Sequence, residues 1–291
     1  MSRGLIIYLS HKNMDKIAFD NFFKPYAKNV DQAENILFWQ LSDDIIFEII
    51  KKSLPDNLSE ADVILDAGGG TGRWVIKLSK VFSSRFILYD LSEDMLNQAK
   101  ENIGSAGLND RVKIINGDLA AMDRVADESV SHAVSIYSPI SFIQEKGKAA
   151  AELCRVLKPG GRLLMMGHGY YNAIASKINN YRASAEELRR LESEHAVKWA
   201  PHVPTLNVFS RETMEKMLAD AGFKIVCTYG VPVFVQPGME DFDPENKKQS
   251  PVSQALGNPD FYQEVFALEM KYNGHPDIAN RGVNIFTVVE K

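Results

Sequence analysis

Residues 63–74 read VILDAGGGTGRW, and this stretch decides the fold. An apolar run ends on Asp66, a glycine-rich segment follows, and a second apolar pattern begins at Trp74. This order predicts a strand, a tight turn and a helix. Glycine suits such a turn because it accepts positive φ angles and lets the backbone approach a ligand. Amide groups at the start of the helix then favour a negatively charged ligand group.

The spacing of the glycines separates two kinds of nucleotide site. A dinucleotide fingerprint reads G-x-G-x-x-G, and counted from Gly68 its third glycine would fall on Arg73. The chain instead has D-x-G-x-G-x-G, which is made of Asp66, Gly68, Gly70 and Gly72. This pattern resembles motif I of the class I S-adenosylmethionine-dependent methyltransferases. A nicotinamide-dependent dehydrogenase is disfavoured, and a purely structural glycine turn is the alternative.

The second predicted strand ends in another acid. Residues 85–90 (RFILYD) have the pattern of a buried strand, and Asp90 follows the first glycine of the motif by 22 positions. In nucleotide-binding α/β folds, an acid about 20 residues after the glycines accepts hydrogen bonds from ribose hydroxyls. The resemblance therefore implies that Asp90 holds both ribose hydroxyls of S-adenosyl-L-methionine and that Leu91 is a cofactor-binding residue. Ser92 is the better N-cap for the helix that follows.

The third predicted strand, Val112–Asn116, is followed by Asp118 and Leu119. In the family that the chain resembles, an acid at this point meets the adenine amino group, and the backbone of the next residue contacts the ring edge. The resemblance therefore places Asp118 and Leu119 at the adenine. Asp118 is equally suited to cap a short helix, and this alternative stays open.

The fourth predicted strand, about 130–137, leads toward the methyl acceptor. Enzymes that methylate exocyclic base nitrogens usually carry (Asp/Asn)-Pro-Pro-Tyr here, whereas this chain has Tyr137 followed by Ser-Pro-Ile. Magnesium-dependent catechol-type enzymes place carboxylates at the ends of the fourth and fifth strands, where this chain has Ser135 and His168. We therefore expect no metal site. The resemblance implies that Ser135 contacts the cofactor.

A second signature lies at residues 152–169 (ELCRVLKPGGRLLMMGHG). A helical pattern is stopped by a Pro-Gly-Gly turn, and a fifth strand follows over Arg162–Met166. This turn is frequent in the ubiquinone- and menaquinone-biosynthesis-like branch of the class I family, of which the chain is identified as a member. The resemblance implies a Rossmann-like α/β fold with helical lid segments. Its sheet is expected to be seven-stranded and mostly parallel, with a sixth strand at Phe223–Val231 and an antiparallel last strand at Val283–Val289.

We divide the chain into an N-terminal helical cap, residues 1–57, and an S-adenosylmethionine-binding methyltransferase domain, residues 58–291. Lid insertions are expected at about 170–207, with a charged helix at about 183–198, and at 236–281, with a helix that Asn258 caps; between them Ser210 is expected to cap a helix over 211–221. Such segments fold over the carboxyl ends of the strands in this family and build the acceptor pocket. The expected wall residues are aromatic or histidine: Tyr26, Trp39, Tyr137, Phe142, Tyr170, Tyr171, Trp199 and His202. Each alone is more simply a core residue, but together they predict a small, largely apolar or aromatic acceptor.

The composition limits the partners. The net charge of −5 lacks the basic footprint of a nucleic-acid-binding protein. No apolar run reaches the roughly 18 residues of a membrane helix. Residues 1–13 lack the pattern of a cleavable signal peptide, and Met14 is an alternative natural start. Cys154 and Cys227 are expected to be buried thiols, which fits a reducing cytoplasm.

The chemistry that the resemblance implies is an in-line displacement at a sulfonium methyl group, with S-adenosyl-L-homocysteine as the product. Aromatic rings stabilise such a cation by about 0.5–2 kcal/mol, and Tyr26 and Tyr137 are the candidates. An acceptor hydroxyl or ammonium also has to lose a proton. His168 ends the fifth strand, and an ordinary histidine pKa of about 6.5 suits a general base. His202 is the second candidate, and a histidine that only orders its loop is the alternative.

The sequence thus predicts a cytoplasmic methyltransferase that uses S-adenosylmethionine and acts on oxygen, nitrogen or carbon of a small molecule. The alternatives are an RNA or protein methyltransferase and a non-catalytic module that only binds S-adenosylmethionine. The sequence does not set the oligomeric state.

Overall fold

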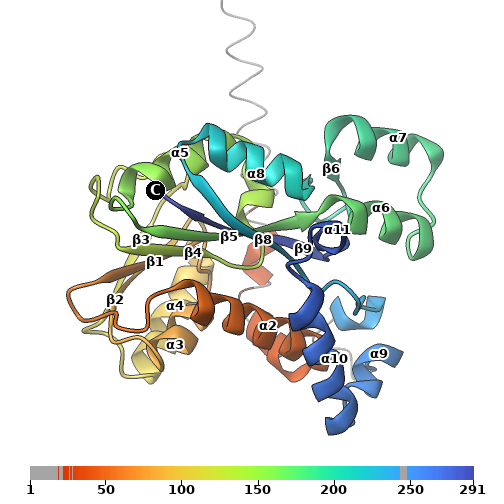
Figure 1. Ribbon diagram of the computed structural model, residues 1–291, viewed down its shortest axis with the longest axis horizontal. Helices are drawn as coiled ribbons and strands as arrows, with labels where there is room; N and C mark the ends of the chain where they lie inside the picture. The colour runs from red at the N-terminus through yellow and green to blue at the C-terminus, as the bar shows by residue number, and fades with distance from the viewer. Residues whose placement is uncertain (1–18, 20–21, 26, 28, 243–247) are drawn as a thin grey trace, which may run out of the picture.

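The computed structural model describes residues 19, 22–25, 27, 29–242 and 248–291. A twisted sheet runs through the middle of the molecule and helices cover both of its faces (Figure 1). Five neighbouring strands run parallel in the order β3 (Val112–Asn116), β2 (Arg85–Asp90), β1 (Val63–Ala67), β4 (His132–Ser135) and β5 (Arg162–Gly169). The carboxyl ends of these strands therefore meet at one edge of the sheet, where open α/β sheets bind ligands.

The sheet is completed by the end of the chain. The last strand, β9 (Asn284–Glu290), inserts antiparallel between β5 and β8 (Lys224–Val231). The order 3-2-1-4-5-9-8 is that of the class I methyltransferase fold, so the predicted seven-stranded sheet with an antiparallel last strand is confirmed.

Two further strands were not predicted. β7 (Leu206–Phe209) pairs in parallel with the last two residues of β5, and β6 (Ala196–Val197) pairs antiparallel with β7. Because β9 occupies the other side of β5 along its length, β7 continues the sheet beyond the end of β4. The fifth strand is consequently longer than predicted and ends at Gly169 instead of Met166.

The two helical layers follow from the alternation of side chains along the strands. On β5, Leu164 and Met166 pack with α2 (Leu37–Ser53), α3 (Arg73–Ser79) and α4 (Glu93–Ser105). Leu163 and Met165 pack on the opposite face, with α5 (Lys146–Val156) and α8 (Arg211–Asp220). The predicted caps are present, because Ser92 Oγ accepts from the Met95 amide and Ser210 Oγ from the Thr213 amide. Capping of this kind contributes about 1 kcal/mol to a helix.

The segment after β5, where a lid insertion is predicted, has a small core of its own. It contains α6 (Tyr170–Asn179), α7 (Ala185–Glu194), β6 and β7, and it lies at one end of the sheet (Figure 1). The buried side chains that hold it together are Ala173, Leu191, Val197, Leu206 and Val208. The charged helix predicted near 183–198 is α7, whereas α6 was not predicted.

The segment between β8 and β9 packs beside the N-terminal part of the chain. It contains η3 (Met239–Phe242), α9 (Pro251–Ala255), α10 (Pro259–Tyr272) and α11 (Pro276–Ala279), and the predicted Asn258 cap of α10 is present. Three hydrogen bonds tie this segment to α2. Trp39 Nε1 donates to the Asp241 carbonyl (2.6 Å), the Phe38 amide to Ser253 Oγ (3.3 Å), and the Tyr262 hydroxyl to Asp44 (2.8 Å).

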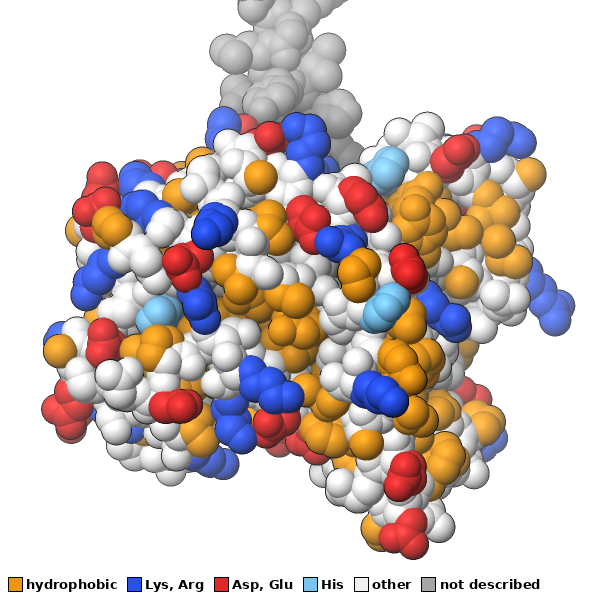
Figure 2. All heavy atoms as spheres, in the orientation of Figure 1, with side chains coloured by type: hydrophobic (Ala, Val, Ile, Leu, Met, Phe, Trp, Pro, Cys, Tyr) orange, Lys and Arg blue, Asp and Glu red, His pale blue; other side chains and the backbone are white. Residues whose placement is uncertain are grey.

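The surface of these added segments is partly apolar. Figure 2 shows hydrophobic side chains gathered on one face over the lid and the C-terminal helices. Large apolar side chains are exposed on α6 (Tyr171 and Ile178) and on α10 (Phe261 and Leu268). Cys154 and Cys227 are unpaired and half-buried. Within the described ranges, no helix has both the length and the apolar character needed to cross a membrane.

Candidate functional site

The glycine motif forms a tight loop at the carboxyl end of β1. Gly68, Gly70 and Gly72 have φ angles of +78°, +53° and +79°, which side chains other than glycine rarely adopt. A Cβ atom at Gly68 would lie 2.4 Å from the side chain of Pro139, and one at Gly69 would lie 2.6 Å from the Asp66 carboxylate. The loop therefore needs glycine both for its backbone angles and for close packing.

Asp90 stands at the end of β2 beside this loop. Its Oδ2 accepts a hydrogen bond from the Gly70 amide (2.9 Å) and its Oδ1 accepts one from the Ser92 amide (2.8 Å). Burial raises the pKa of Asp90, and the backbone hydrogen bonds oppose that shift. Each carboxylate oxygen has a second lone pair, so the group is oriented by the backbone and retains capacity for two hydroxyl donors.

Asp66 lies beneath the loop and is 1% exposed. Its Oδ2 has no hydrogen-bond partner among the described residues. Burial, which is the larger cause, and the charge of the neighbouring Asp90 raise the pKa of Asp66 to about 7. A buried acceptor without a donor points to a donor that a ligand supplies. S-adenosylmethionine carries an ammonium group and ribose hydroxyls, which are hydrogen-bond donors, so a site with acceptors such as Asp66 and Asp90 fits this cofactor.

The other residues predicted to bind the cofactor differ in exposure and in hydrogen bonding. Asp118 is exposed and its Oδ1 accepts from the Ala120 amide (2.8 Å) in a turn; no helix begins at Asp118, so the alternative of a helix cap is wrong. Leu91 is 39% exposed, whereas Leu119 is buried. Ser135 is fully buried, and its hydroxyl donates to the Ala67 carbonyl (2.8 Å). The hydroxyl of Ser135 is thus engaged inside the sheet.

The chain makes a left-handed turn directly after β4. Tyr137 and Ser138 have φ angles of +59° and +66°, which ends the strand at Ser135 instead of residue 137. The Tyr137 hydroxyl donates to Asp43 on α2. Burial and the Asp43 charge raise the pKa of Tyr137 well above its ordinary value. The phenol therefore stays protonated, and a catalytic contribution of Tyr137 is restricted to its ring.

His168 belongs to a polar group on the α2 side of the sheet. It continues the alternation of Leu164 and Met166, and it lies directly opposite Asn284 in the β5–β9 register. Opposed residues in antiparallel strands have Cβ atoms about 4.5–5.5 Å apart. Asn284 in turn accepts from the Ser138 hydroxyl (3.0 Å). Burial lowers the pKa of His168 to about 4, well below the ordinary value on which the sequence argument relied.

The predicted aromatic wall residues fall into separate groups. The Phe142 ring contacts those of Phe19, Phe22 and Phe23, with centroids 5.3–6.3 Å apart. Trp39 contacts Tyr137 (5.5 Å). Four others belong to the lid: Tyr170 stacks on His195, Trp199 contacts Tyr181, Tyr171 is half exposed and His202 is exposed. Tyr26 lies outside the described residues.

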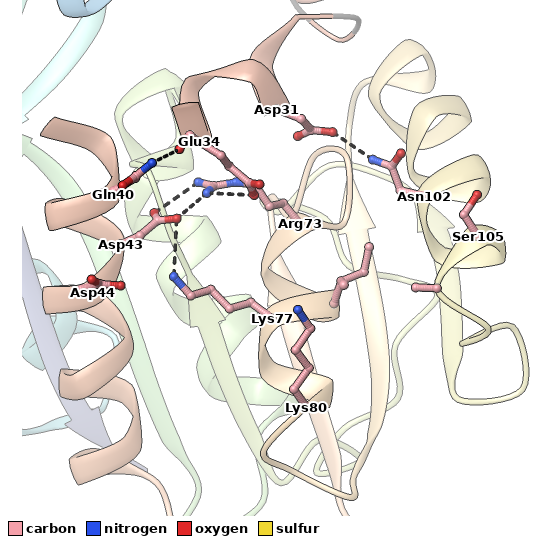
Figure 3. Close-up of a pocket in the computed structure, with 12 residues that line it drawn as sticks. Asp31, Glu34, Gln40, Asp43, Asp44, Arg73, Lys77, Lys80, Asn102 and Ser105 are labelled. Carbon is pink, nitrogen blue, oxygen red and sulfur yellow. Dashed lines mark hydrogen bonds and ion pairs between the residues drawn. The ribbon is translucent and has the colours of Figure 1, made fainter. Parts of the chain in front are cut away.

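Arg73 and Asp43 were missed as site residues. The guanidinium of Arg73 bonds both carboxylate oxygens of Asp43, with an Nη2–Oδ1 distance of 3.3 Å. This pair lines a groove of about 730 Å³ between η1 (Val30–Asn35), α2, α3 and α4 (Figure 3). Arg73 directly follows the glycine motif, but nothing in the sequence identifies its partner 30 positions upstream. Among the described residues, no group of three or more histidines, cysteines or acids has the arrangement of a metal site.

Comparisons with known proteins agree with this geometry. Residues 64–161 match the family model described as a methyltransferase domain. The tRNA 5-carboxymethoxyuridine methyltransferase of Escherichia coli O157:H7 is 25% identical over 272 residues, which cover 91% of this chain and 90% of that protein. The ubiquinone/menaquinone biosynthesis C-methyltransferase UbiE of Yersinia pestis (strain Pestoides F) is 29% identical over 178 residues, which cover 56% of this chain and 66% of that protein.

Solved structures share the fold. Geranyl diphosphate C-methyltransferase from Streptomyces coelicolor A3(2) superimposes with a TM-score of 0.52 at 14% identity, covering 84% of this chain and 77% of that one. The cyclase SpnF gives a TM-score of 0.53 at 18% identity, covering 87% and 80%. The chain belongs to the class I S-adenosylmethionine-dependent methyltransferases. It is an enzyme of that kind, with S-adenosylmethionine as methyl donor and S-adenosylhomocysteine as product.

Proposed function

We propose that this enzyme methylates a small, largely apolar or aromatic molecule at oxygen, nitrogen or carbon. The observation that carries the proposal is the aromatic cluster at the carboxyl edge of the sheet, where Phe142 of η2 (Pro139–Phe142) meets Phe19, Phe22 and Phe23. These rings come from segments far apart in the chain. Aromatic side chains bury large apolar areas, so a wall of this kind favours an apolar acceptor and excludes water.

The proposed cofactor site is the glycine loop with the two acids. Asp90 accepts from the ribose hydroxyls and Asp66 faces the ammonium group, in keeping with its unpartnered oxygen. The other cofactor residues that we propose are Gly68, Gly70, Gly72, Leu91, Asp118, Leu119, Ser135 and Tyr26. When bound, S-adenosylmethionine supplies an electrophilic methyl group on a sulfonium. The chain's own contribution is alignment, and positioning of two reactants supplies up to roughly 7–11 kcal/mol.

His168 is the proposed contact of the acceptor's reactive group. With a pKa of about 4, its imidazole is neutral at neutral pH and is available as a hydrogen-bond acceptor or base. The opposed Asn284 adds an amide that is itself fixed by Ser138. We propose that an acceptor hydroxyl passes its proton to His168 as its oxygen takes the methyl group. An acceptor ammonium instead passes its proton to His168 first and then attacks as the neutral amine. In both cases the sulfur would leave as a neutral thioether.

A second candidate function is methylation of an RNA. It is favoured by the alignment with the tRNA 5-carboxymethoxyuridine methyltransferase, which extends over 91% of this chain. The net charge of −5 opposes it, because affinity for nucleic acid depends mostly on phosphate contacts by Lys and Arg.

The two candidates differ in where a methyl label goes. The enzyme would be incubated with methyl-labelled S-adenosylmethionine and either a metabolite extract or total RNA of its source cells. Label that enters a nuclease-resistant, solvent-extractable product supports a small-molecule acceptor. Label that is acid-precipitable and released by ribonuclease contradicts it and supports the second candidate. The Asp90→Ala variant serves as the control, because it removes the proposed ribose contact and leaves the aromatic cluster intact.

A further inference from the structure

The left-handed turn after β4 is held from outside the sheet. Two consecutive residues other than glycine, Tyr137 and Ser138, have positive φ angles. Such angles persist only where the surrounding contacts fix them, and they gather at functional sites. The contacts that fix this turn therefore indicate which part of the site it positions.

One end of the turn is fixed by an ion pair. The Tyr137 hydroxyl donates to Asp43, and Asp43 is bound by the Arg73 guanidinium, which also lies 5.3 Å from the centre of the Tyr137 ring. Trp39 packs on the same ring at 5.5 Å. The exposed fractions of the Arg73 and Asp43 side chains are 18% and 8%. Figure 3 shows Asp43 and Arg73 pointing toward one another from α2 and α3, with Lys77 also directed at Asp43.

The other end of the turn contacts both halves of the site. Pro139 packs so closely on Gly68 that a Cβ atom there would lie 2.4 Å from it. Ser138 donates to Asn284, and Ser141 Oγ accepts from the His168 amide (3.0 Å). The turn therefore contacts the cofactor loop on one side. On the other side it contacts His168 and Asn284, the residues of the proposed acceptor edge.

We propose that Arg73 and Asp43 are positioning residues which, through Tyr137, hold this turn against the glycine loop and thereby set the affinity for the cofactor. Arg73 is the first residue of α3, and Asp43 belongs to α2 in the N-terminal cap. The cap thus shapes the cofactor site through Tyr137, from the opposite side of the turn. The inference concerns the cofactor site alone and does not depend on which acceptor the enzyme uses.

The test is calorimetric binding of S-adenosylhomocysteine to three variants, well below their melting temperatures. Asp43→Asn removes the charge that holds Arg73 and is expected to weaken binding about tenfold, and Tyr137→Phe removes one hydroxyl and is expected to weaken it about threefold. Asp44→Asn is the matched control. Asp44 is the next residue of α2, and it accepts from Tyr262 of α10 instead of from the turn, so its binding should stay within about twofold.

Melting temperatures separate positioning from simple stabilisation. If Asp43 only stabilises the fold, Asp43→Asn lowers the melting temperature and binds S-adenosylhomocysteine as tightly as the native chain, which would overturn the proposal. Arg73→Lys supplies an independent check, because lysine keeps the charge but cannot bond both carboxylate oxygens in one plane. The proposal requires that this variant also binds weakly, and full recovery of affinity with lysine contradicts it.

Discussion

The cofactor loop and the acceptor edge lie at the same end of the sheet but are built in opposite ways. The loop is made of backbone, and its key contact, from the Gly70 amide to Asp90, joins residues 20 positions apart. The acceptor edge is made of side chains from distant segments. Ser138 donates to Asn284 over 146 positions, and Asn284 lies opposite His168 in the β5–β9 register.

This difference predicts that the loop is shared more widely among relatives than the acceptor edge. A backbone site depends on glycines and two acids at fixed spacing, and the stretch that holds them lies within residues 64–161, which match the methyltransferase-domain model. A side-chain site changes whenever any contributing segment changes. Two relatives, a tRNA methyltransferase and a C-methyltransferase of ubiquinone and menaquinone biosynthesis, are named for different acceptors.

The strongest test of whether the two regions act independently is to replace His168 by alanine. If it serves only the acceptor edge, His168→Ala should lower methyl transfer about hundredfold, the lower range for loss of a general base. Binding of S-adenosylhomocysteine should stay unchanged. Methyl transfer is measured with the acceptor found in the labelling experiment and binding by calorimetry, with the exposed His275→Ala as control. A parallel loss of cofactor binding would show that the two regions are not separate.

The converse change is Asp90→Ala, which should act on the cofactor alone. Loss of hydrogen bonds to a charged group costs about 1.5–3 kcal/mol, so S-adenosylhomocysteine should bind about tenfold to hundredfold more weakly in a calorimeter. Asp94→Ala, in the first turn of α4, is the matched control for loss of a nearby negative charge. Equal losses in the two variants would mean that the effect is general electrostatics and not a ribose contact.

Features that depend on residues close in the sequence were also the ones that could be predicted from it. Strands β2 and β3 occur at the residues predicted, and the caps Ser92, Ser210 and Asn258 are where the pattern placed them. All of these depend on neighbours within a few positions. The order of the strands followed from the resemblance, because chain order and the two signatures together specify one topology.

The features that were missed depend on distant partners. β6 and β7 have two and four residues, and they exist because β5 continues past the end of β4. Helix α6 begins without a side-chain cap after Gly169, so no local signal marks its start. The pKa of His168 was misjudged for the same reason, since burial by other segments lowers it to about 4.

A third prediction concerns the backbone of the loop itself. Gly68→Ala and Gly160→Ala both place alanine at a positive φ, +78° and +75°, but only the first meets a neighbour, at 2.4 Å, whereas nothing lies within 4 Å of the second. Forcing extra volume into a packed position costs about 1–3 kcal/mol. Gly68→Ala should therefore lose about that much more unfolding free energy than Gly160→Ala in urea titrations. Equal losses of unfolding free energy in the two variants would mean that Pro139 moves away from the added methyl group at little cost.

The last prediction is a pH dependence that has one sign for the stability of the empty protein and the opposite sign for cofactor affinity. The pKa of Asp66 is raised from 3.8 to about 7 in the folded chain, so the folded state binds more protons than the unfolded state between these values. The stability of the empty protein should therefore fall as the pH rises from about 4 to about 7 and then level off. Melting curves across this range measure it, and Asp66→Asn should remove this part of the slope.

Binding should show the opposite trend, because an ammonium group favours the ionised carboxylate. The affinity for S-adenosylhomocysteine should rise with pH up to about 7, by at most about tenfold per pH unit for one proton. Asp90 also has a raised pKa, so the comparison with Asp66→Asn is what assigns the slope to Asp66. An affinity that follows the same pH curve in Asp66→Asn would show that the unpartnered oxygen does not face the ammonium. The cofactor loop would then bind its ligand through backbone amides and Asp90, and the buried Asp66 would have no direct part in binding.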